Sequence, residues 1–174
     1  EDAETVKEWI LSLQFLDPDE PAYGAFKTSS GPGKYIGGKG YYRIVPYFTN
    51  IALVGLLQKN DSATIDAVKL WLEWYLDRTK NSSDNFVLDH WYNANGGEEL
   101  TCLADIDPTI DPAAQPLLCN HIDAVDSSAA TFLGLAWHYH QLTGDNELFL
   151  NNKDTFIDIA QVILNLQQSD GLAW

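Results

Sequence analysis

The spacing of apolar residues restricts the fold of this chain more than any other feature of its sequence. Five segments carry apolar residues three and four positions apart, which places those residues on one face of an α-helix. Sustained alternation of apolar and polar residues, the pattern of a half-buried strand, is almost absent. The sequence therefore predicts an all-α chain, with helices over residues 3–16, 46–58, 62–78, 127–143 and 154–167.

Short and long connections alternate between these helices. The second and third are joined by a tight turn, and the fourth and fifth by a somewhat longer one, so each pair is expected to form an αα-hairpin. Residues 17–45 and 81–125 form connections far above the usual loop length, and such loops are either functional or disordered. Five aromatic residues in the first loop argue against disorder there, and residues 86–92 in the second are a short extended candidate.

Residues at the ends of the predicted helices can satisfy unpaired backbone groups. Ser62 can cap the third helix, and the pair Ser127 and Ser128 can cap the fourth. Gly144 is expected to end the fourth helix, because glycine readily takes the left-handed conformation found at helix C-termini.

Two short sequence matches indicate that the hairpins repeat. Residues 9–14 match residues 162–167 at an offset of 153, and residues 53–56 match residues 132–135 at an offset of 79. The second offset is about half the first, as expected if each repeat is one hairpin plus one long loop. A stacked repeat of this size predicts an α-solenoid or a closed α/α toroid. Chance similarity between leucine-rich helices is the alternative.

The composition limits the classes of partner. With 45% hydrophobic residues and six tryptophans, the chain has the composition of a folded domain. Its formal net charge of −15 argues against nucleic acid and anionic membrane surfaces, which attract basic patches. No apolar run approaches the roughly 20 residues that span a bilayer. Neutral or weakly charged partners, carbohydrates among them, remain compatible.

The cysteines and two glycosylation sequons favour an extracellular, secreted protein. Cys102 and Cys119 share one polar, proline-rich segment. A disulfide between them would add about 3 kcal/mol of stability, although both can also be free thiols. The sequons at Asn60 and Asn81 fall in predicted loops. Together these signals favour an oxidising compartment, and Glu1 in the place of an initiator methionine indicates a processed or trimmed start.

Three short segments resemble the six-hairpin glycosidases: Leu166–Gly171, Asp89–Tyr92 and Asp126–Ala129. That superfamily folds as an (α/α)6 toroid of twelve helices and mostly cleaves glycosidic bonds, so the resemblance implies this fold and activity. Within it, the unsaturated glucuronyl hydrolases and rhamnogalacturonyl hydrolases offer the nearest positional analogy. They carry one functional Asp in a loop between hairpins and another at the start of the next inner helix, and Asp89 and Asp126 match these two places.

The resemblance also implies how much of a toroid is present. Residues 1–174 are expected to form a single domain, in which αα-hairpin repeats make part of an (α/α)6 toroid with the long loops at one end. Twelve helices of about 15 residues, with their loops, need roughly twice this length. The chain is therefore expected to be the N-terminal half, completed by a missing C-terminal half or by another copy of the chain.

Glycoside hydrolysis needs two carboxyl groups, one as general acid and one as base or nucleophile. Asp89 lies between apolar and aromatic residues, a setting that raises a carboxyl pKa toward that of a general acid. A strand-end Asp bonded to backbone is the alternative. Asp126 would be ionised at a helix N-terminus, where an ordinary N-cap is the alternative. Asp123 and Asp170 are weaker candidates for the same two roles, and Asp123 is assigned to substrate binding.

Loop aromatics are the candidates for carbohydrate binding, because sugars present apolar C–H faces that stack on rings. The alternative is that these rings cover helix ends as core. His138 and His140 alternate faces in the middle of a helix and are interpreted as structural. The candidate substrate-binding residues are Trp91, Tyr92, Tyr41, Tyr42, His90, Asp123 and Trp174.

No cofactor or metal is expected. The sequence lacks a glycine-rich phosphate loop, zinc-ligand spacing and a nucleophile elbow. Asp105, Asp107 and Asp111 resemble a calcium loop only superficially, because the glycine at the sixth position and the terminal Glu are absent. Two function classes follow. One is a secreted glycoside hydrolase-like protein acting on a poly- or oligosaccharide, and the other is a non-catalytic carbohydrate-binding or structural α-helical repeat protein.

Overall fold

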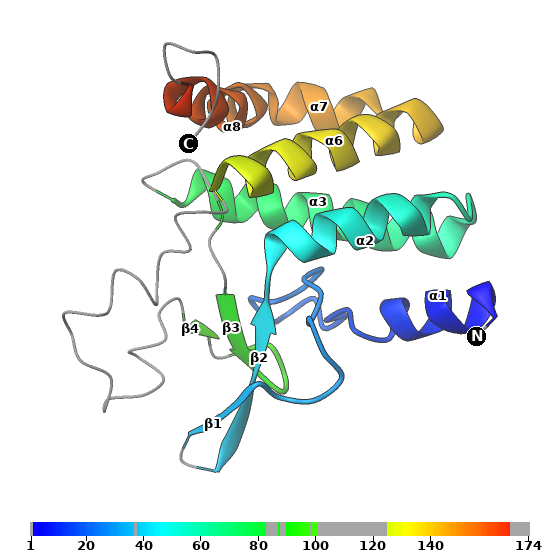
Figure 1. Ribbon diagram of the computed structural model, residues 1–174, viewed down its shortest axis with the longest axis vertical. Helices are drawn as coiled ribbons and strands as arrows, with labels where there is room; N and C mark the ends of the chain where they lie inside the picture. The colour runs from blue at the N-terminus through cyan, green and yellow to red at the C-terminus, as the bar shows by residue number, and fades with distance from the viewer. Residues whose placement is uncertain are drawn as a thin grey trace. The chain divides into compact units, whose positions relative to one another are not determined.

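The computed structural model of the chain describes residues 2–36, 38–82, 87, 90–97, 99–100 and 125–167. They belong to two compact units, each built from two separate stretches of chain. Unit 1 comprises Glu1–Val45 and Leu88–His121, and unit 2 comprises Pro46–Val87 and Ile122–Trp174. Helices predominate (Figure 1), so the coarse prediction of an α-rich chain is confirmed. The expectation of a single domain stays a prediction.

Unit 2 holds the two predicted hairpins. The first helices of the two hairpins, α2 and α6, pack against each other, and α8 packs against α6. In Figure 1, α2 and α6 run in the same direction, and α3 and α8 run back. The helices of unit 2 are α2 (Pro46–Leu57), α3 (Ser62–Lys80), α6 (Val125–Thr143), α7 (Asn146–Asn151) and α8 (Lys153–Leu166).

The helix ends correct one prediction and confirm another. Asp61, not Ser62, caps α3, and its carboxylate accepts a 2.9 Å hydrogen bond from the Thr64 backbone N–H. Ser62 is instead the first helical residue. At the end of α6, Gly144 takes a φ of 66° and its N–H donates to the His140 carbonyl at 2.8 Å, as a left-handed C-terminal glycine should.

Stacked aromatic rings form the core of unit 2. Phe132 of α6 lies 3.8 Å from Tyr75 of α3 between ring centroids, with the two planes 10° apart. On α3, Trp71 stacks on Trp74 at 4.9 Å. Such pairs add to the stabilisation that burial of their area supplies. The largest aliphatic residues around them with less than 2% exposure are Leu53, Val68, Leu72, Leu76, Leu135 and Ile159.

A buried asparagine connects three helices of this core. The side chain of Asn50, on α2, has no solvent exposure. Its Oδ1 accepts a 2.9 Å hydrogen bond from Trp71 Nε1 on α3. Its Nδ2 donates to the Ser128 carbonyl and to Thr131 Oγ1 of α6, each at 3.2 Å. A buried amide is stable only when such partners are present, so this residue fixes how α2, α3 and α6 meet.

The two hairpins share a pattern of exposure. Residues 53–58 of α2 and 132–137 of α6, at an offset of 79, follow the same order of buried, half-buried and exposed side chains. Between the second helices, α3 and α8, the agreement is limited to three residues at an offset of 91. Residues 64–66 of α3 and 155–157 of α8 are each buried, half-buried and exposed in turn. The predicted helix 154–167 differs from α8 by one residue at each end.

Unit 1 begins with α1 (Ala3–Leu11), which ends earlier than the predicted residue 16. Ser12 Oγ donates to the Trp9 carbonyl at 2.6 Å, and this bond occupies an acceptor at the end of the helix. The chain then extends, and Gln14 forms an isolated antiparallel bridge with Phe26. The apolar periodicity continues past the helix because Leu13 and Phe15 are buried in the extended segment.

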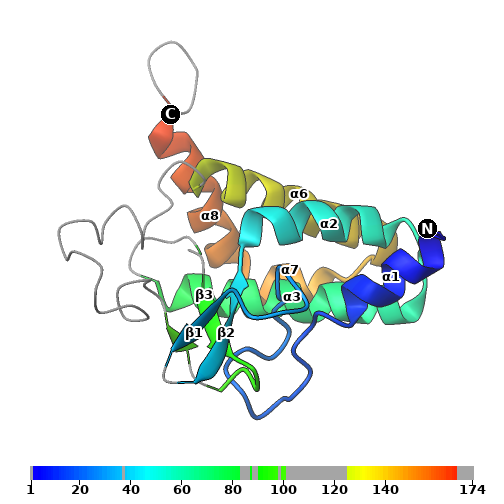
Figure 2. The same ribbon diagram turned by 60° about the horizontal axis from the view of Figure 1, so that its bottom comes forward.

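A four-stranded antiparallel sheet in unit 1 departs from the all-α prediction. Its strand order is β1-β2-β3-β4, and Figure 2 shows the first three strands side by side. The predicted extended segment 86–92 overlaps β3, but β2 was expected to be loop. The strands are β1 (Lys34–Ile36), β2 (Lys39–Ile44), β3 (His90–Asn93) and β4 (Glu99–Leu100).

Both faces of β2 carry large side chains, which explains why its sequence lacks alternation. Tyr42 pairs with Tyr92 across the strands, and Arg43 pairs with Trp91 on the opposite face. Phe15 contacts the Tyr92 ring edge-on, with centroids 5.9 Å apart. A strand that is contacted on both faces does not show the apolar–polar period of a half-buried strand.

Candidate functional site

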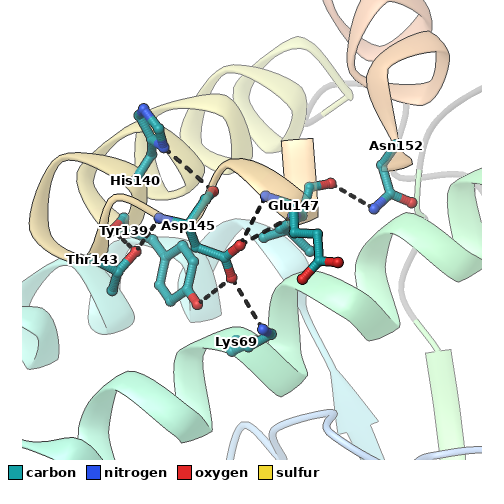
Figure 3. Close-up of polar contacts among 8 residues, drawn as sticks. Lys69, Tyr139, His140, Thr143, Asp145, Glu147 and Asn152 are labelled. Carbon is teal, nitrogen blue, oxygen red and sulfur yellow. Dashed lines mark hydrogen bonds and ion pairs between the residues drawn. The ribbon is translucent and has the colours of Figure 1, made fainter. Parts of the chain in front are cut away.

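The most connected polar cluster in unit 2 surrounds Asp145, between α6 and α7 (Figure 3). Asp145 Oδ1 accepts hydrogen bonds from the backbone N–H groups of Glu147 and Leu148, each at 3.1 Å, and so caps α7. Its Oδ2 accepts from Lys69 Nζ on α3 and from the Tyr139 hydroxyl on α6, each at 3.0 Å. One carboxylate therefore joins three helices.

The charges in this cluster stabilise one another. Burial opposes ionisation of Asp145, but the N–H of Leu148 together with Lys69 and Tyr139 outweighs it, so the pKa of Asp145 lies below its usual value. The hydrogen bond to Asp145 raises the pKa of Lys69. Burial, followed by the hydrogen bond to Asp145, raises the pKa of Tyr139 to about 12. At neutral pH the cluster is thus carboxylate, ammonium and neutral phenol.

In this arrangement Asp145 holds α3, α6 and α7 together and does not act as a proton donor. Each of its two oxygens already accepts two hydrogen bonds, and its lowered pKa opposes protonation. The sequence pattern predicted only the end of a helix at Gly144, and α7 was not predicted. An Asp directly before Asn-Glu-Leu is an N-cap signature that could have predicted it.

Replacing Asp145 with alanine is expected to lower the free energy of unfolding by about 2 kcal/mol, because the cap of α7 and the acceptor for Tyr139 are both removed. Asp145→Asn should cost less, because asparagine also caps helices but lacks the charge that pairs with Lys69. Urea unfolding followed by circular dichroism measures both differences. Asp158→Ala, an exposed site on α8, is the control and should change stability by less than about 0.5 kcal/mol.

The difference in the free energy of unfolding between wild type and Asp145→Asn should also depend on pH. The pKa of Asp145 is depressed in the fold, so its contribution is complete above the ordinary value of about 4 and is lost as the pH falls through the depressed value. The pKa of Tyr139 is raised to about 12 in the fold, so its contribution to stability is complete below about pH 10 and is lost as the pH rises toward about 12. A stability difference that stays constant from pH 7 to pH 2 would contradict this account.

Asp126 occupies the first turn of α6 but does not act as its N-cap. The helix begins at Val125. The side chain of Asp126 accepts from the backbone N–H of the next residue, Ser127, at 2.7 Å through Oδ1. The prediction that Ser127 and Ser128 cap this helix is wrong, because both lie inside it. Asp126 is half-buried, and its Oδ2 accepts no hydrogen bond from the residues that the structure describes.

Three of the residues assigned to carbohydrate binding are buried in unit 1. Tyr92 has no exposure, and Tyr41 and His90 are also buried. His90 and Tyr92 lie on one face of β3, with ring centroids 6.1 Å apart. Because a stacking platform must present its ring to the ligand, these three residues fit the alternative interpretation, in which they are core.

Trp91 and Tyr42 are half-buried and lie on opposite faces of the sheet. A Cβ atom added at Gly33 would lie 3.2 Å from the Trp91 ring, so this ring rests on the glycine backbone. The guanidinium carbon of Arg43 is 5.9 Å from the centroid of the same ring. The sheet therefore does not join the four predicted aromatics of residues 41–42 and 91–92 into one platform.

Several sequence predictions lie outside the described residues. They include the catalytic candidate Asp89, the disulfide pair and the calcium-like acids. These residues are Asp89, Cys102, Asp105, Asp107, Asp111, Cys119, Asp123, Asp170 and Trp174. The expected convergence of Asp89 with Asp126 stays a prediction, as does the disulfide.

Both sequon asparagines are exposed. Asn60 lies between α2 and α3 with a φ of 51°, the left-handed region that asparagine tolerates. Asn81 follows α3, and its Nδ2 donates to the Asp77 carbonyl at 2.9 Å. Their glycosylation stays a prediction. His138 is exposed, while His140 Nδ1 lies 3.4 Å from the backbone carbonyl of Asp145, in keeping with a structural role.

Within the described ranges, no three His, Cys, Asp or Glu side chains gather in a way that could hold a metal ion. None of the helices in these ranges has both the length and the apolar character needed to cross a membrane. Comparison of the chain with protein-family models, curated proteins and solved structures finds no match.

Proposed function

We propose that this chain is part of a secreted glycoside hydrolase that cleaves a poly- or oligosaccharide by acid–base catalysis with two carboxyl groups. Asp126 is one of the two, and Asp89 is its partner. The reaction needs the carboxyl groups about 5–5.5 Å apart for a retaining mechanism or about 6.5–9.5 Å for an inverting one. The proposal draws on the resemblance of the sequence to six-hairpin glycosidases and on the following features of unit 2.

The shared exposure pattern of the hairpins supports an α/α repeat. The sequence match between residues 53–56 and 132–135 has a counterpart in burial, because each aligned pair has the same exposure class. Two helices with equal patterns in neighbouring hairpins are what a stacked repeat requires. We therefore propose that α2 and α6 are successive inner helices, with α3 and α8 outside them, as in part of an (α/α)6 toroid.

The placement of Asp126 is the observation that carries the catalytic proposal. The equivalent position in the first hairpin, 79 residues earlier, is Tyr47, so the repeat itself does not require an acid there. Asp126 does not cap the helix, and one of its oxygens has no partner among the described residues. A half-buried carboxylate with a spare oxygen at a helix start is available for a water or a sugar hydroxyl.

Replacing Asp126 with asparagine is expected to lower kcat for glycan hydrolysis by about 10²-fold or more, because proton transfer is lost while shape is kept. Release of reducing ends from neutral and acidic polysaccharides, measured with the full-length protein, gives the rate. Asp154→Asn is the matched control, since Asp154 is also an acid in the first turn of its helix, α8, but is exposed. This control should keep the wild-type rate.

Two outcomes would contradict the proposed catalytic function. One is full activity of Asp126→Asn, and the other is an absence of hydrolysis by the wild type on every glycan tested. Circular dichroism of the variant separates loss of catalysis from loss of folding.

A non-catalytic α-helical repeat protein is the second candidate, and the outer face of α8 favours it. Ile157 and Leu164 are 53% and 59% exposed on this face. The positions 91 residues earlier in α3 hold the exposed acids Asp66 and Glu73. Apolar residues in place of acids on an outer face are typical of protein contact surfaces rather than of catalysis.

A further inference from the structure

Helices α2 and α6 share an exposed face that carries almost no charge. The two helices lie side by side and run in the same direction (Figures 1 and 2). Their buried sides pack against α3 and α8, so their exposed sides point away from those helices. Charged residues make up 20% of the chain, yet α2 has none and α6 has only Asp126, in its first turn. Two large apolar side chains are exposed there, Ile51 at 49% and Trp137 at 57%.

The two helices are in register, so equivalent residues lie at the same level. Asn50 of α2 donates to the Ser128 carbonyl and to Thr131 Oγ1 of α6. Its own equivalent, 79 residues later, is Ala129, which lies between these two partners in the sequence.

Three levels of the face therefore each hold one residue of the first hairpin and its equivalent in the second. A large side chain and a smaller one share the first and third levels, and the large one changes helix between them. Glycines occupy the middle level, where an added Cβ atom would contact no other part of the described chain within 4 Å. The exposed pairs are Ile51 and Ala130, Gly55 and Gly134, and Gln58 and Trp137.

We propose that this face binds a second copy of the chain, related to the first by a two-fold axis that runs along the helices. Such an axis sets α2 of one copy against α6 of the other without reversing their direction, so each residue faces its own equivalent. Ile51 then faces the second copy's Ala130, and Trp137 faces the second copy's Gln58. Large side chains thus meet smaller ones, and the paired glycines let the backbones approach closely. Phe48, one turn before Ile51, lies at the rim, where truncation has little effect on association.

The distribution of charge favours a second copy over a different partner. Two chains of net charge −15 repel each other wherever acids face acids, and this face avoids that contact. It also offers no row of acids with which to bind a basic protein. Its lack of charge and its exposed indole are typical of an interface core. On α8, by contrast, the exposed acids Asp154 and Asp158 lie beside Ile157, so a second copy would meet its own acids there.

The oligomeric state of the chain tests the proposal. Sedimentation of the wild type should give twice the mass of one chain. Gly134→Glu should give the mass of one chain at the same concentration, because a carboxylate buried without a partner raises the dissociation constant by about 10²-fold or more. This variant should stay folded by circular dichroism, because the space beside Gly134 is open and glutamate favours a helix more than glycine does. Ile157→Glu, at a 53% exposed site on α8, is the control and should remain a dimer.

Cysteine cross-linking tests the orientation of the two copies. Ile51→Cys chains mixed with Ala130→Cys chains should form a disulfide-linked pair on mild oxidation, because the two positions face each other. Ile51→Cys mixed with Gln141→Cys should not, because position 141 lies about three turns further along α6. Both mixtures contain the same two native cysteines, so these cannot produce a difference between them.

A monomeric wild type would overturn the proposal, as would a Gly134→Glu variant that remains a dimer. Dissociation by Ile157→Glu, or equal cross-linking in the two mixtures, would also exclude the proposed face or its orientation. The result is separate from the test of glycan hydrolysis, because no variant used here alters Asp126.

Discussion

Replacing Phe132 with alanine is expected to lower the free energy of unfolding by about 4 kcal/mol, the largest effect of any single substitution proposed for this chain. The Phe132 ring has no solvent exposure and stacks on Tyr75 at 3.8 Å. It also lies 5.9 Å from the ring of Phe156 on α8. Truncation removes the buried area of the ring and leaves a cavity where α3, α6 and α8 meet. Urea or guanidinium unfolding followed by circular dichroism measures the change.

The chain offers a matched control for this substitution. Phe48 on α2 has the same side chain but is 62% exposed, so Phe48→Ala should change stability by less than about 0.5 kcal/mol. Similar losses in the two variants would show that Phe132 is not the buried centre of unit 2.

Asn50→Ala is expected to destabilise the chain by about 3 kcal/mol, because one substitution removes a hydrogen-bond partner from two buried groups and from a half-buried hydroxyl. Trp71 Nε1 loses its acceptor, and the Ser128 carbonyl and Thr131 Oγ1 each lose a donor. The same unfolding experiment measures the loss. Asn151→Ala, at an exposed site on α7, is the control and should stay within about 0.5 kcal/mol of wild type. If the two alanine variants were equally stable, Asn50 would not be the polar junction of α2, α3 and α6.

The helices of unit 2 could be predicted because their apolar stripes face a common core. The predicted helix 46–58 differs from α2 by one residue, and the predicted helix 62–78 ends two residues before α3 does. The errors fall at helix ends, because a single side-chain hydrogen bond decides at which residue a helix begins or ends. Asp61 and Ser62 are both good caps by type, and only the structure shows that the Asp61 carboxylate accepts from the Thr64 N–H.

The sheet of unit 1 could not be predicted from local pattern. Both faces of β2 carry large residues, so the period of two is hidden, and its partner β3 lies on the far side of the α2–α3 hairpin in sequence. The same long-range pairing buries Tyr41 and Tyr92, which the sequence allowed as either stacking residues or core. Burial of loop aromatics depends on contacts that sequence spacing does not encode.

The candidate site was predictable only in part, for a similar reason. Asp126 was found because a helix start can be recognised from the sequence, although its hydrogen bonding differs from that of a cap. The Asp145 cluster was missed because Lys69 lies 76 residues away. A contact over that separation is set by the packing of α6 beside α3, which no local motif records.

The division of each unit between two stretches of chain has a consequence for the order of folding. β2 ends at Ile44 and β3 begins at His90, so this ladder forms only after the ends of a long intervening segment meet. Closing such a loop lowers chain entropy before any contact compensates it. The α2–α3 hairpin needs only the turn at residues 58–61 and can form at once. Folding should therefore begin in the α2–α3 hairpin. Formation of the β2–β3 ladder should then limit the rate at which unit 1 folds.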